Sequence, residues 1–249
     1  MRVLSKPPIS DRASLSWPRD TKESAFDESW SFNDNNFWLS VFEMYRENIQ
    51  IKKSEIAVRN LQKIFSATFK ISGVKGFQAM SLRDLSLESG ISMGGLYSYI
   101  GSKNDLASMI EGGLRHHIDL VTNNLVEEGL KPLDSLKAVI FGALYMMERL
   151  SPWYYFCFME LKGLPRDKQE KALEIELRFE RFVIDSLKRG EQTHMFKCEN
   201  PDLLASQVTA QLQQWHLKPW KFKLKKISLP QYADYCYQSL LNGLDRLSV

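Results

Sequence analysis

The chain has 249 residues, of which 44% are apolar and 25% charged, and its formal net charge is +3. These values are typical of a globular protein and exclude a fibrous or wholly disordered chain. No stretch offers the roughly 18 uninterrupted apolar residues that a membrane span requires. No apolar run of signal-peptide length follows Arg2 and Lys6. We therefore expect a cytoplasmic protein that has no membrane partner.

The first fifty residues show little periodicity. Up to about residue 35, isolated aromatic side chains stand among Pro, Ser, Asp and Asn, a composition typical of segments without a core of their own. Apolar side chains then recur at helical spacing between Phe37 and Tyr45. We expect residues 1–50 to be a mostly disordered extension with one short amphipathic helix, and Met44 is an alternative start of the folded part.

Three helices are predicted between Ile51 and Tyr99. The first ends at the glycines Gly73 and Gly76. The second begins at Ser81 with a capping-box-like pattern that uses Asp84, and it ends after two turns at Gly90. The third is short, is capped by Ser92 and runs to about Tyr99. Two short helices joined by a glycine-containing turn are typical of a helix-turn-helix, whose recognition helix enters the major groove.

Apolar residues are expected to hold these helices together: Leu82, Leu85, Leu87, Ile91 and Leu96. The other face is polar or small-sided. From Ile51 to Gly112, eight Lys or Arg residues stand against five Asp or Glu residues. This modest excess has the sign that contact with phosphates needs.

The remainder of the chain is also helical in pattern. We expect helices at 103–128, 132–149, 151–162, 166–190, 201–217 and 229–247, and several of them have a proline where the helix begins. The fold class is therefore all-α. Its expected domains are the extension 1–50, a helix-turn-helix domain at 51–110 and a helical effector-binding and dimerisation domain at 111–249.

The helix-turn-helix segment resembles the N-terminal signature of the TetR family of transcriptional regulators. The resemblance covers about Ile56 to Leu106, and the residues that carry it are Gly76-Phe77, Ser81 to Leu85, Ser89 to Ser92, Gly94 to Tyr99, Ser102-Lys103 and Leu106. It implies a homodimer that binds double-stranded DNA, most often as a repressor released from a palindromic operator by a small effector. It also implies that the last two helices pack against those of the mate as a four-helix bundle.

Matching that motif residue by residue implies the DNA-binding positions. Met93 stands where the family often has Lys or Arg, and Gly95 replaces a common Thr or Ser, so the resemblance implies no base preference. Two adjacent glycines lower the helix propensity by about 1 kcal/mol each, and we expect a flexible recognition helix. The positions are Ser81, Arg83, Ser92, Met93, Gly94, Gly95, Tyr97, Ser98, Tyr99 and Lys103.

The effector-binding prediction depends on bulky aromatic residues, which favour a large apolar ligand but equally suit a plain core. The expected ligand-binding residues are Phe141, Tyr145, Trp153, Tyr154, Phe158, Trp215 and Trp220. This region loosely resembles the TetR subset that responds to acyl-CoA thioesters. Lysines between Lys218 and Lys226 form a cluster that either receives CoA phosphates or is a solvated loop.

No enzyme signature is apparent. The four His and three Cys residues are scattered, without zinc spacing, a nucleophile elbow or a phosphate loop. We therefore expect no catalytic residue, no metal and no cofactor. Two alternatives stay open: a ligand-binding interaction module with a degenerate DNA reader, and a helical enzyme that acts on an acyl-CoA.

Overall fold

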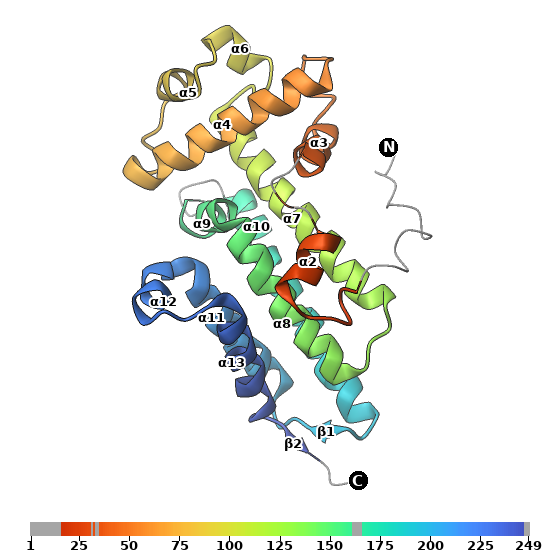
Figure 1. Cartoon of the computed structure of the whole chain (residues 1–249). Helices are drawn as coiled ribbons and strands as arrows, with labels where there is room; N and C mark the ends of the chain where they lie inside the picture. Colours follow the sequence, from red (N-terminus) through yellow and green to blue (C-terminus); the bar gives the residue numbers. More distant parts are fainter. Residues whose placement is uncertain (1–15, 31, 33–34, 161–165, 247–249) are drawn as a thin grey trace. The chain divides into compact units, whose positions relative to one another are not determined.

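The computed structural model describes residues 16–30, 32, 35–160 and 166–246. Almost all the regular structure is helical (Figure 1). The elements are α2 (Glu23–Ser29), α3 (Asn35–Met44), α4 (Ser54–Lys75), α5 (Leu82–Ser89), α6 (Met93–Tyr97), α7 (Lys103–Glu127), α8 (Pro132–Arg149), α9 (Ser151–Met159), α10 (Arg166–Gln192), β1 (Phe196–Lys197), α11 (Pro201–Leu217), α12 (Pro219–Lys225), α13 (Leu229–Leu241) and β2 (Asp245–Arg246). The predicted all-α fold class is confirmed.

The chain divides into two compact units, each made of separate segments. The helix-turn-helix unit consists of Ser31–His117 and Pro152–Leu173, and the α8 unit of Met1–Trp30, Ile118–Ser151 and Glu174–Val249. The expected domains were continuous in sequence, with α9 in the effector-binding and dimerisation domain at 111–249. In the structure α7 passes from one unit to the other after His117, and α9 belongs to the helix-turn-helix unit.

In the helix-turn-helix unit, the long helix α4 has α3 on one side and α5 on another (Figure 1). Its apolar stripe is buried, with Leu61, Ile64 and Phe65 fully inaccessible. The α3 residue Trp38 packs edge-on against Phe65, with ring centroids 5.4 Å apart. An amphipathic helix gains most of its stability from such burial rather than from intrinsic propensity, so α3 and α4 stabilise each other.

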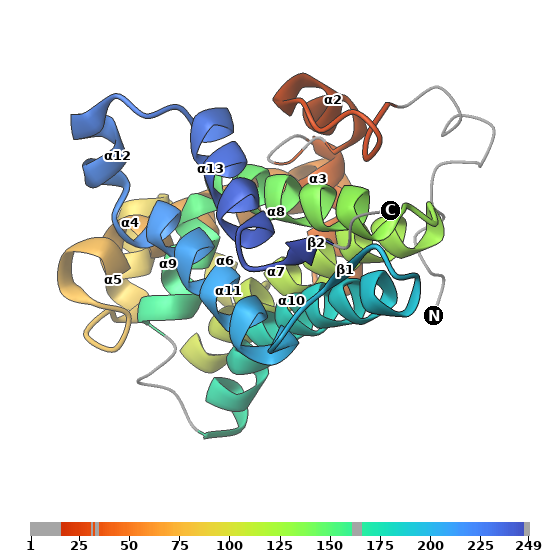
Figure 2. The same cartoon turned by 90° about the horizontal axis from the view of Figure 1, so that it is seen from below.

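In the α8 unit, α8 is the central helix, and α2, α11 and α13 all pack on it. Figure 2 shows α8 alongside α13, with α2 over another part of its surface. Polar bonds fix the packing: the Trp215 indole N–H donates to Glu148 at 2.7 Å, and the Tyr237 hydroxyl donates to the Leu133 carbonyl at 3.3 Å. The C-terminal helices are thus held on α8 by both apolar and polar contacts.

The expectation of a mostly disordered extension is wrong for the described residues before Gln50. The predicted short helix is present as α3, and α2 is a further helix that was not predicted. Trp17 and Phe26 are buried. Trp17 and Phe26 pack against each other and against Tyr145 of α8, which is more than a hundred residues away, so helical periodicity gives no signal for their burial. Residues 1–15 lie outside the described part.

Several helix ends agree with the sequence, but the end of the last helix does not. Pro132 and Pro201 are the first residues of α8 and α11. The last helix ends at Leu241, because Asn242 and Gly243 follow, and the expected helical residues Asp245 and Arg246 pair instead with β1 in an antiparallel register. The helix α12 was not predicted. Of the helices that the structure describes, none is long and apolar enough to cross a membrane.

Candidate nucleic-acid interface

The helices α5 and α6 form a helix-turn-helix on α4. Leu85 and Leu96 are fully buried and Ile91 nearly so, as expected for residues that hold the two helices together. Leu87 was expected to join them, but its side chain is 84% exposed. It lies two positions, about 200° of helical turn, from the core residue Leu85, so it points to the opposite side of α5.

The start of α5 is fixed by a reciprocal capping box, as predicted. The Ser81 hydroxyl accepts from the Asp84 backbone N–H at 3.1 Å, and the Asp84 carboxylate accepts from the Ser81 N–H at 2.8 Å. Lys75, at the end of α4, also donates to this carboxylate at 2.7 Å. The Lys75 ammonium and the Ser81 donors hold the pKa of Asp84 well below its usual range. The cap therefore remains ionised at neutral pH.

The turn between the helices is made by Gly90, which adopts φ 67° in the left-handed region that favours glycine. Ser92 then caps α6 by accepting from the Gly95 N–H at 3.2 Å. The two glycines of α6 have different surroundings. A Cβ on Gly95 would lie 2.8 Å from Ile91 Cγ2, whereas a Cβ on Gly94 would meet nothing within 4 Å. Gly95 is thus required for packing. Gly94 has open space around it and leaves the outer surface of α6 without a side chain at that position.

The outer side of the two helices is open to solvent. Tyr97 is 49% exposed. On α6, Gly94, Tyr97 and Ser98 lie on one side because they are three and four positions apart. The predicted DNA-binding residues that are exposed or half-buried are Ser81, Arg83, Ser92, Met93, Gly94, Gly95, Tyr97, Ser98 and Lys103.

Tyr99 requires a correction. Only 2% of the residue is exposed, and its hydroxyl accepts a hydrogen bond from the Asn60 amide of α4 at 2.9 Å. Burial is also the main cause of the raised pKa of its phenol. A side chain buried in this way cannot reach a phosphate, so Tyr99 positions the end of the recognition segment on α4. Its neighbour Ile100, also buried, has the same packing role.

Lys103 is at the start of α7, as predicted, but its ammonium is partly used by the chain itself. It donates to the Gln78 carbonyl at 2.9 Å and lies 4.9 Å from the centre of the Phe77 ring. Burial, and secondarily the charge of Lys75, lower its pKa. An ammonium has three donors. Lys103 therefore closes the loop before α5 and retains donors for a phosphate.

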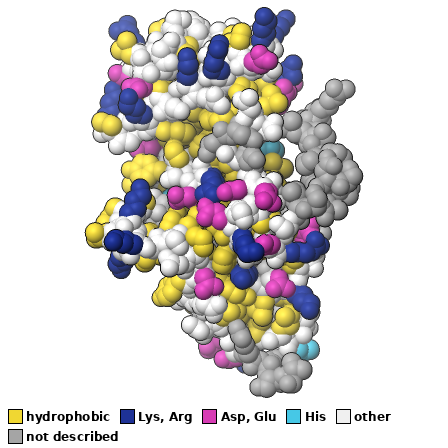
Figure 3. Space-filling view, viewed as in Figure 1, with side chains coloured by type: hydrophobic (Ala, Val, Ile, Leu, Met, Phe, Trp, Pro, Cys, Tyr) yellow, Lys and Arg dark blue, Asp and Glu magenta, His cyan; other side chains and the backbone are white. Residues whose placement is uncertain are grey.

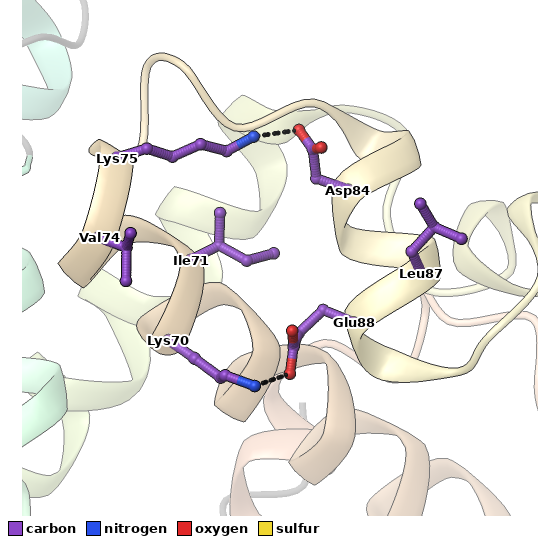
Figure 4. A pocket seen from close by; sticks show the side chains of 7 residues that line it. All are labelled: Lys70, Ile71, Val74, Lys75, Asp84, Leu87 and Glu88. Atoms are coloured by element: carbon purple, nitrogen blue, oxygen red, sulfur yellow. Dashed lines mark hydrogen bonds and ion pairs between the residues drawn. The ribbon is translucent and has the colours of Figure 1, made fainter.

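A surface hollow of about 410 Å³ lies between α4 and α5 (Figure 4). Its floor includes Ile71, and Val74 and Leu87 stand at its sides with their side chains largely in solvent. The ion pair Lys70–Glu88, at 2.6 Å, and the pair of Lys75 with Asp84 bridge the two helices across it. Exposed pairs of this kind contribute little to stability. The hollow is an open cleft on the surface of the helix-turn-helix.

Three of the predicted effector residues are on α9 and belong to the helix-turn-helix unit. Trp153 is buried among aromatic rings of α3 and α4, with centroid distances of 5.0 Å to Phe65 and 5.6 Å to Phe69. Tyr154 is buried, which raises its pKa, and Phe158 is half-buried. The helix that was expected to line an effector site therefore packs directly onto α4.

The other predicted effector residues lie in the α8 unit and fall into three places. Phe141 and Tyr145 are on α8. The Phe26 ring of α2 lies 5.3 Å from the Tyr145 ring, and the Tyr145 hydroxyl donates to the Thr21 carbonyl at 2.9 Å. Trp215 is buried against Phe222. Trp220 is exposed. The structure thus does not bring the seven predicted residues into one described cavity.

Other residues that build these sites were not predicted. They include Asn60 and Lys75, which support the helix-turn-helix, and Trp17 and Phe26, which cover α8. The roles of these residues depend on contacts with other parts of the chain, and a single sequence carries no signal for such contacts. No group of three or more described His, Cys, Asp or Glu residues is placed to hold a metal ion.

The chain is similar in sequence and in fold to known bacterial regulators. No family model matches the sequence. The HTH-type transcriptional regulator HbdR of Aromatoleum sp. (strain CIB) is 22% identical over 174 residues, which are 69% of this chain and 74% of HbdR.

Several solved structures are similar to this chain in fold over nearly their whole length. A bacterial regulatory protein of the tetR family from Rhodococcus RHA1 has a TM-score of 0.66 at 15% identity, covering 76% of this chain and 98% of its own. The transcriptional regulator FadR from Bacillus subtilis, solved with stearoyl-CoA, has a TM-score of 0.58 at 17% identity, covering 73% and 98%. The chain is therefore a helix-turn-helix protein with the all-α fold of the TetR-family transcriptional regulators.

Proposed function

We propose that this chain is a TetR-family transcriptional regulator that binds double-stranded DNA through α5 and α6. The observation that carries the proposal is the asymmetry of the helix-turn-helix. Its inner residues are buried on α4, while Arg83, Gly94 and Tyr97 face solvent. In this proposal α6 enters the major groove, where Gly94 allows close approach of the backbone, and the start of α5 contacts phosphates.

We further propose that the regulator is a homodimer that reads a palindromic operator. Two exposed apolar side chains on the last helices support this: Leu203 on α11 and Tyr235 on α13. A two-fold dimer presents one α6 to each half-site. Replacing both residues by Glu is expected to halve the mass measured by light scattering, whereas an unchanged mass would place the dimer contact elsewhere.

The proposed mode of action is repression that a small apolar effector relieves. The FadR structure contains stearoyl-CoA, and the aromatic side chains of α9 suit the acyl part of such a ligand. Because Trp153 of α9 contacts Phe65 and Phe69 of α4, a ligand that displaces α9 acts on the helix beneath α5. A preference of about 1–3 kcal/mol for the displaced state lowers DNA affinity about 5- to 150-fold.

DNA binding is tested by selecting duplexes from a random library with the full chain and measuring affinities by fluorescence anisotropy. Tyr97→Ala is expected to weaken all selected duplexes about tenfold or more, because a hydrogen bond to a charged group contributes about 1.5–3 kcal/mol. Arg83→Ala should also reduce the salt dependence by about one phosphate. The control Tyr155→Ala removes an exposed tyrosine of α9 in the same unit and should leave affinity unchanged. Absence of salt-sensitive binding would favour a ligand-binding module with a degenerate reader.

The effector proposal has a separate test. Stearoyl-CoA is titrated into the protein–DNA complex, and release of free CoA is measured in the same mixture. Loss of DNA binding without CoA release supports a regulator. Unchanged DNA affinity would contradict the acyl-CoA proposal while leaving DNA binding intact, and steady CoA release would favour the enzyme alternative.

A further inference from the structure

The short helix α12 is attached to the α8 unit through one side only. Phe222, in its middle, is buried, and its ring centroid lies 4.8 Å from that of Trp215 and 4.5 Å from that of Tyr232. The helix ends at Lys225. Lys226 follows with a positive φ of 52°, and the N–H of Ile227 donates to the Phe222 carbonyl. The aromatic stack therefore fixes which side of α12 faces away from the unit.

The outward side of α12 is apolar at its centre. Trp220 and Leu224 lie two residues before and after Phe222, about 200° from it around the helix. They are also one turn apart, so they form a single apolar patch. Their exposed fractions are 64% and 77%. Two large apolar side chains exposed next to each other are typical of an interaction surface.

Lysines surround this apolar patch. Five of them lie between Lys218 and Lys226, and no Asp or Glu occurs between Leu203 and Ala233. In the described part of the chain, none of these five lysines forms an ion pair. Lys221 donates to the Gln214 amide oxygen. Figure 3 shows dark blue and yellow side chains next to one another at the left edge of the molecule, over α12. The patch thus combines unneutralised positive charge with exposed apolar area.

The combination of positive charge and exposed apolar area indicates which kind of partner fits the patch. A second copy docked through the same patch would bring like charges together around the two-fold axis. A DNA duplex would use the lysines but leave Trp220 and Leu224 in water, because its outer surface is phosphate and sugar. The interface of an anionic bilayer matches both features, since tryptophan and leucine insert at the headgroup level while lysines attract the headgroup phosphates.

We propose that α12 is a docking site for the surface of a membrane that contains anionic phospholipids. The helix lies in the plane of the interface and does not span it. The proposal therefore departs from the expectation of no membrane partner, which was drawn from the lack of a spanning segment. Phe222 stays in the aromatic stack, Trp220 and Leu224 enter the headgroup region, and the flanking lysines contact the phosphates. The attachment is peripheral and reversible, because one short apolar patch and a few charges give only moderate affinity.

The test is co-sedimentation of the full chain with large unilamellar vesicles. We expect binding to vesicles of phosphatidylcholine with 30–40% phosphatidylglycerol (about one anionic lipid in three, enough for a strong surface charge), little binding to pure phosphatidylcholine, and weakening by salt. Lys223→Gln with Lys225→Gln should lower the partition coefficient about 30-fold, because each lysine near such a surface contributes about a fivefold factor. Trp220→Ser with Leu224→Ser should abolish binding at any salt concentration.

The matched control is Lys131→Gln with Lys188→Gln, two exposed lysines of the same unit that change the net charge equally. It should retain nearly all vesicle binding, and thermal unfolding by circular dichroism verifies that every variant is folded. Equal losses in the control and the α12 variants would overturn the proposal, as would absence of binding to the anionic vesicles. A fall in oligomer mass for the Trp220 and Leu224 variant, without a change in vesicle binding, would assign the patch to a second copy instead.

Discussion

The packing of Trp17 on α8 allows a quantitative prediction. Gly142, in the middle of α8, faces the indole of Trp17: a Cβ at this glycine would lie 2.9 Å from one ring carbon and 3.3 Å from another. The Phe26 ring is the next neighbour, at 3.7 Å. The glycine therefore forms a notch that the buried indole fills. Adding a methyl group to this notch should destabilise the protein only while the indole is present.

The magnitudes follow from two opposing terms. Gly142→Ala gains about 1 kcal/mol of helix propensity and loses about 1–3 kcal/mol through overpacking, so the net change in the intact protein is a loss of about 0–2 kcal/mol. Trp17→Ala alone should cost about 3 kcal/mol, as for other buried large-to-small changes. In the Trp17→Ala background the clash is absent, and Gly142→Ala should stabilise by about 1 kcal/mol.

The assay is urea denaturation of the four proteins of this double-mutant cycle, followed by far-ultraviolet circular dichroism because the indole itself is removed. We expect a coupling energy of about 1–3 kcal/mol and a reversal in sign of the Gly142→Ala effect. Additivity of the two substitutions within about 0.5 kcal/mol would refute the packing of Trp17 on α8.

Further predictions concern the helix-turn-helix unit. Gly95→Ala should lower the unfolding temperature relative to Gly94→Ala, because only the first would press on Ile91; equal melting curves would contradict this. Tyr99→Phe should cost about 1 kcal/mol of stability through the lost bond from Asn60 yet leave DNA affinity unchanged in anisotropy titrations, and a tenfold weaker complex would restore Tyr99 to the interface. Burial is the main cause that lowers the pKa of His117 to about 4 from 6.5. The unfolded chain thus takes up the proton first, and stability should fall between about pH 6.5 and 4, by up to about 3 kcal/mol. A His117→Asn variant should have a flatter pH profile in urea titrations, and an identical profile would contradict the assignment.

The neutral form of His117 follows from its two partners. The Nδ1 hydrogen donates to the Gly113 carbonyl at 2.7 Å, because a carbonyl only accepts. The Nε2 atom then accepts from the Ser40 hydroxyl at 2.9 Å. Protonation would add a hydrogen to Nε2, which would then no longer accept from the Ser40 hydroxyl, and the ring would carry a charge in a buried place. The bond also ties α3 to α7.

The sequence alone predicts those features whose causes are local. The capping box at Ser81, the turn at Gly90 and the proline starts of α8 and α11 depend on neighbours within a few residues, and the structure has them all. The exposed face of α6 was predictable for the same reason, since burial of Leu96 decides which side remains outside.

The features that sequence analysis misplaced depend on contacts between distant segments. The aromatic side chains of α9 have the composition expected of a ligand site, but Trp153 packs against aromatic rings of α3 and α4. Tyr99 was placed in the interface by analogy with a motif, whereas its hydroxyl bonds to Asn60, 39 residues away. Short apolar segments such as α2 carry too few turns to show a period, so their burial is decided entirely by tertiary packing.

The anchoring of α2 and α3 has a mechanical consequence. The ion pairs of Arg149 with Glu23 and Asp27 hold α2 on α8, while α3 is packed on α4 in the other unit. Only the six steps from Ser29 to Asn35 join the two helices, and so short a length of chain reaches at most about 20–22 Å. The last residue of α2 and the first residue of α3 therefore cannot lie farther apart than this distance while both helices stay folded.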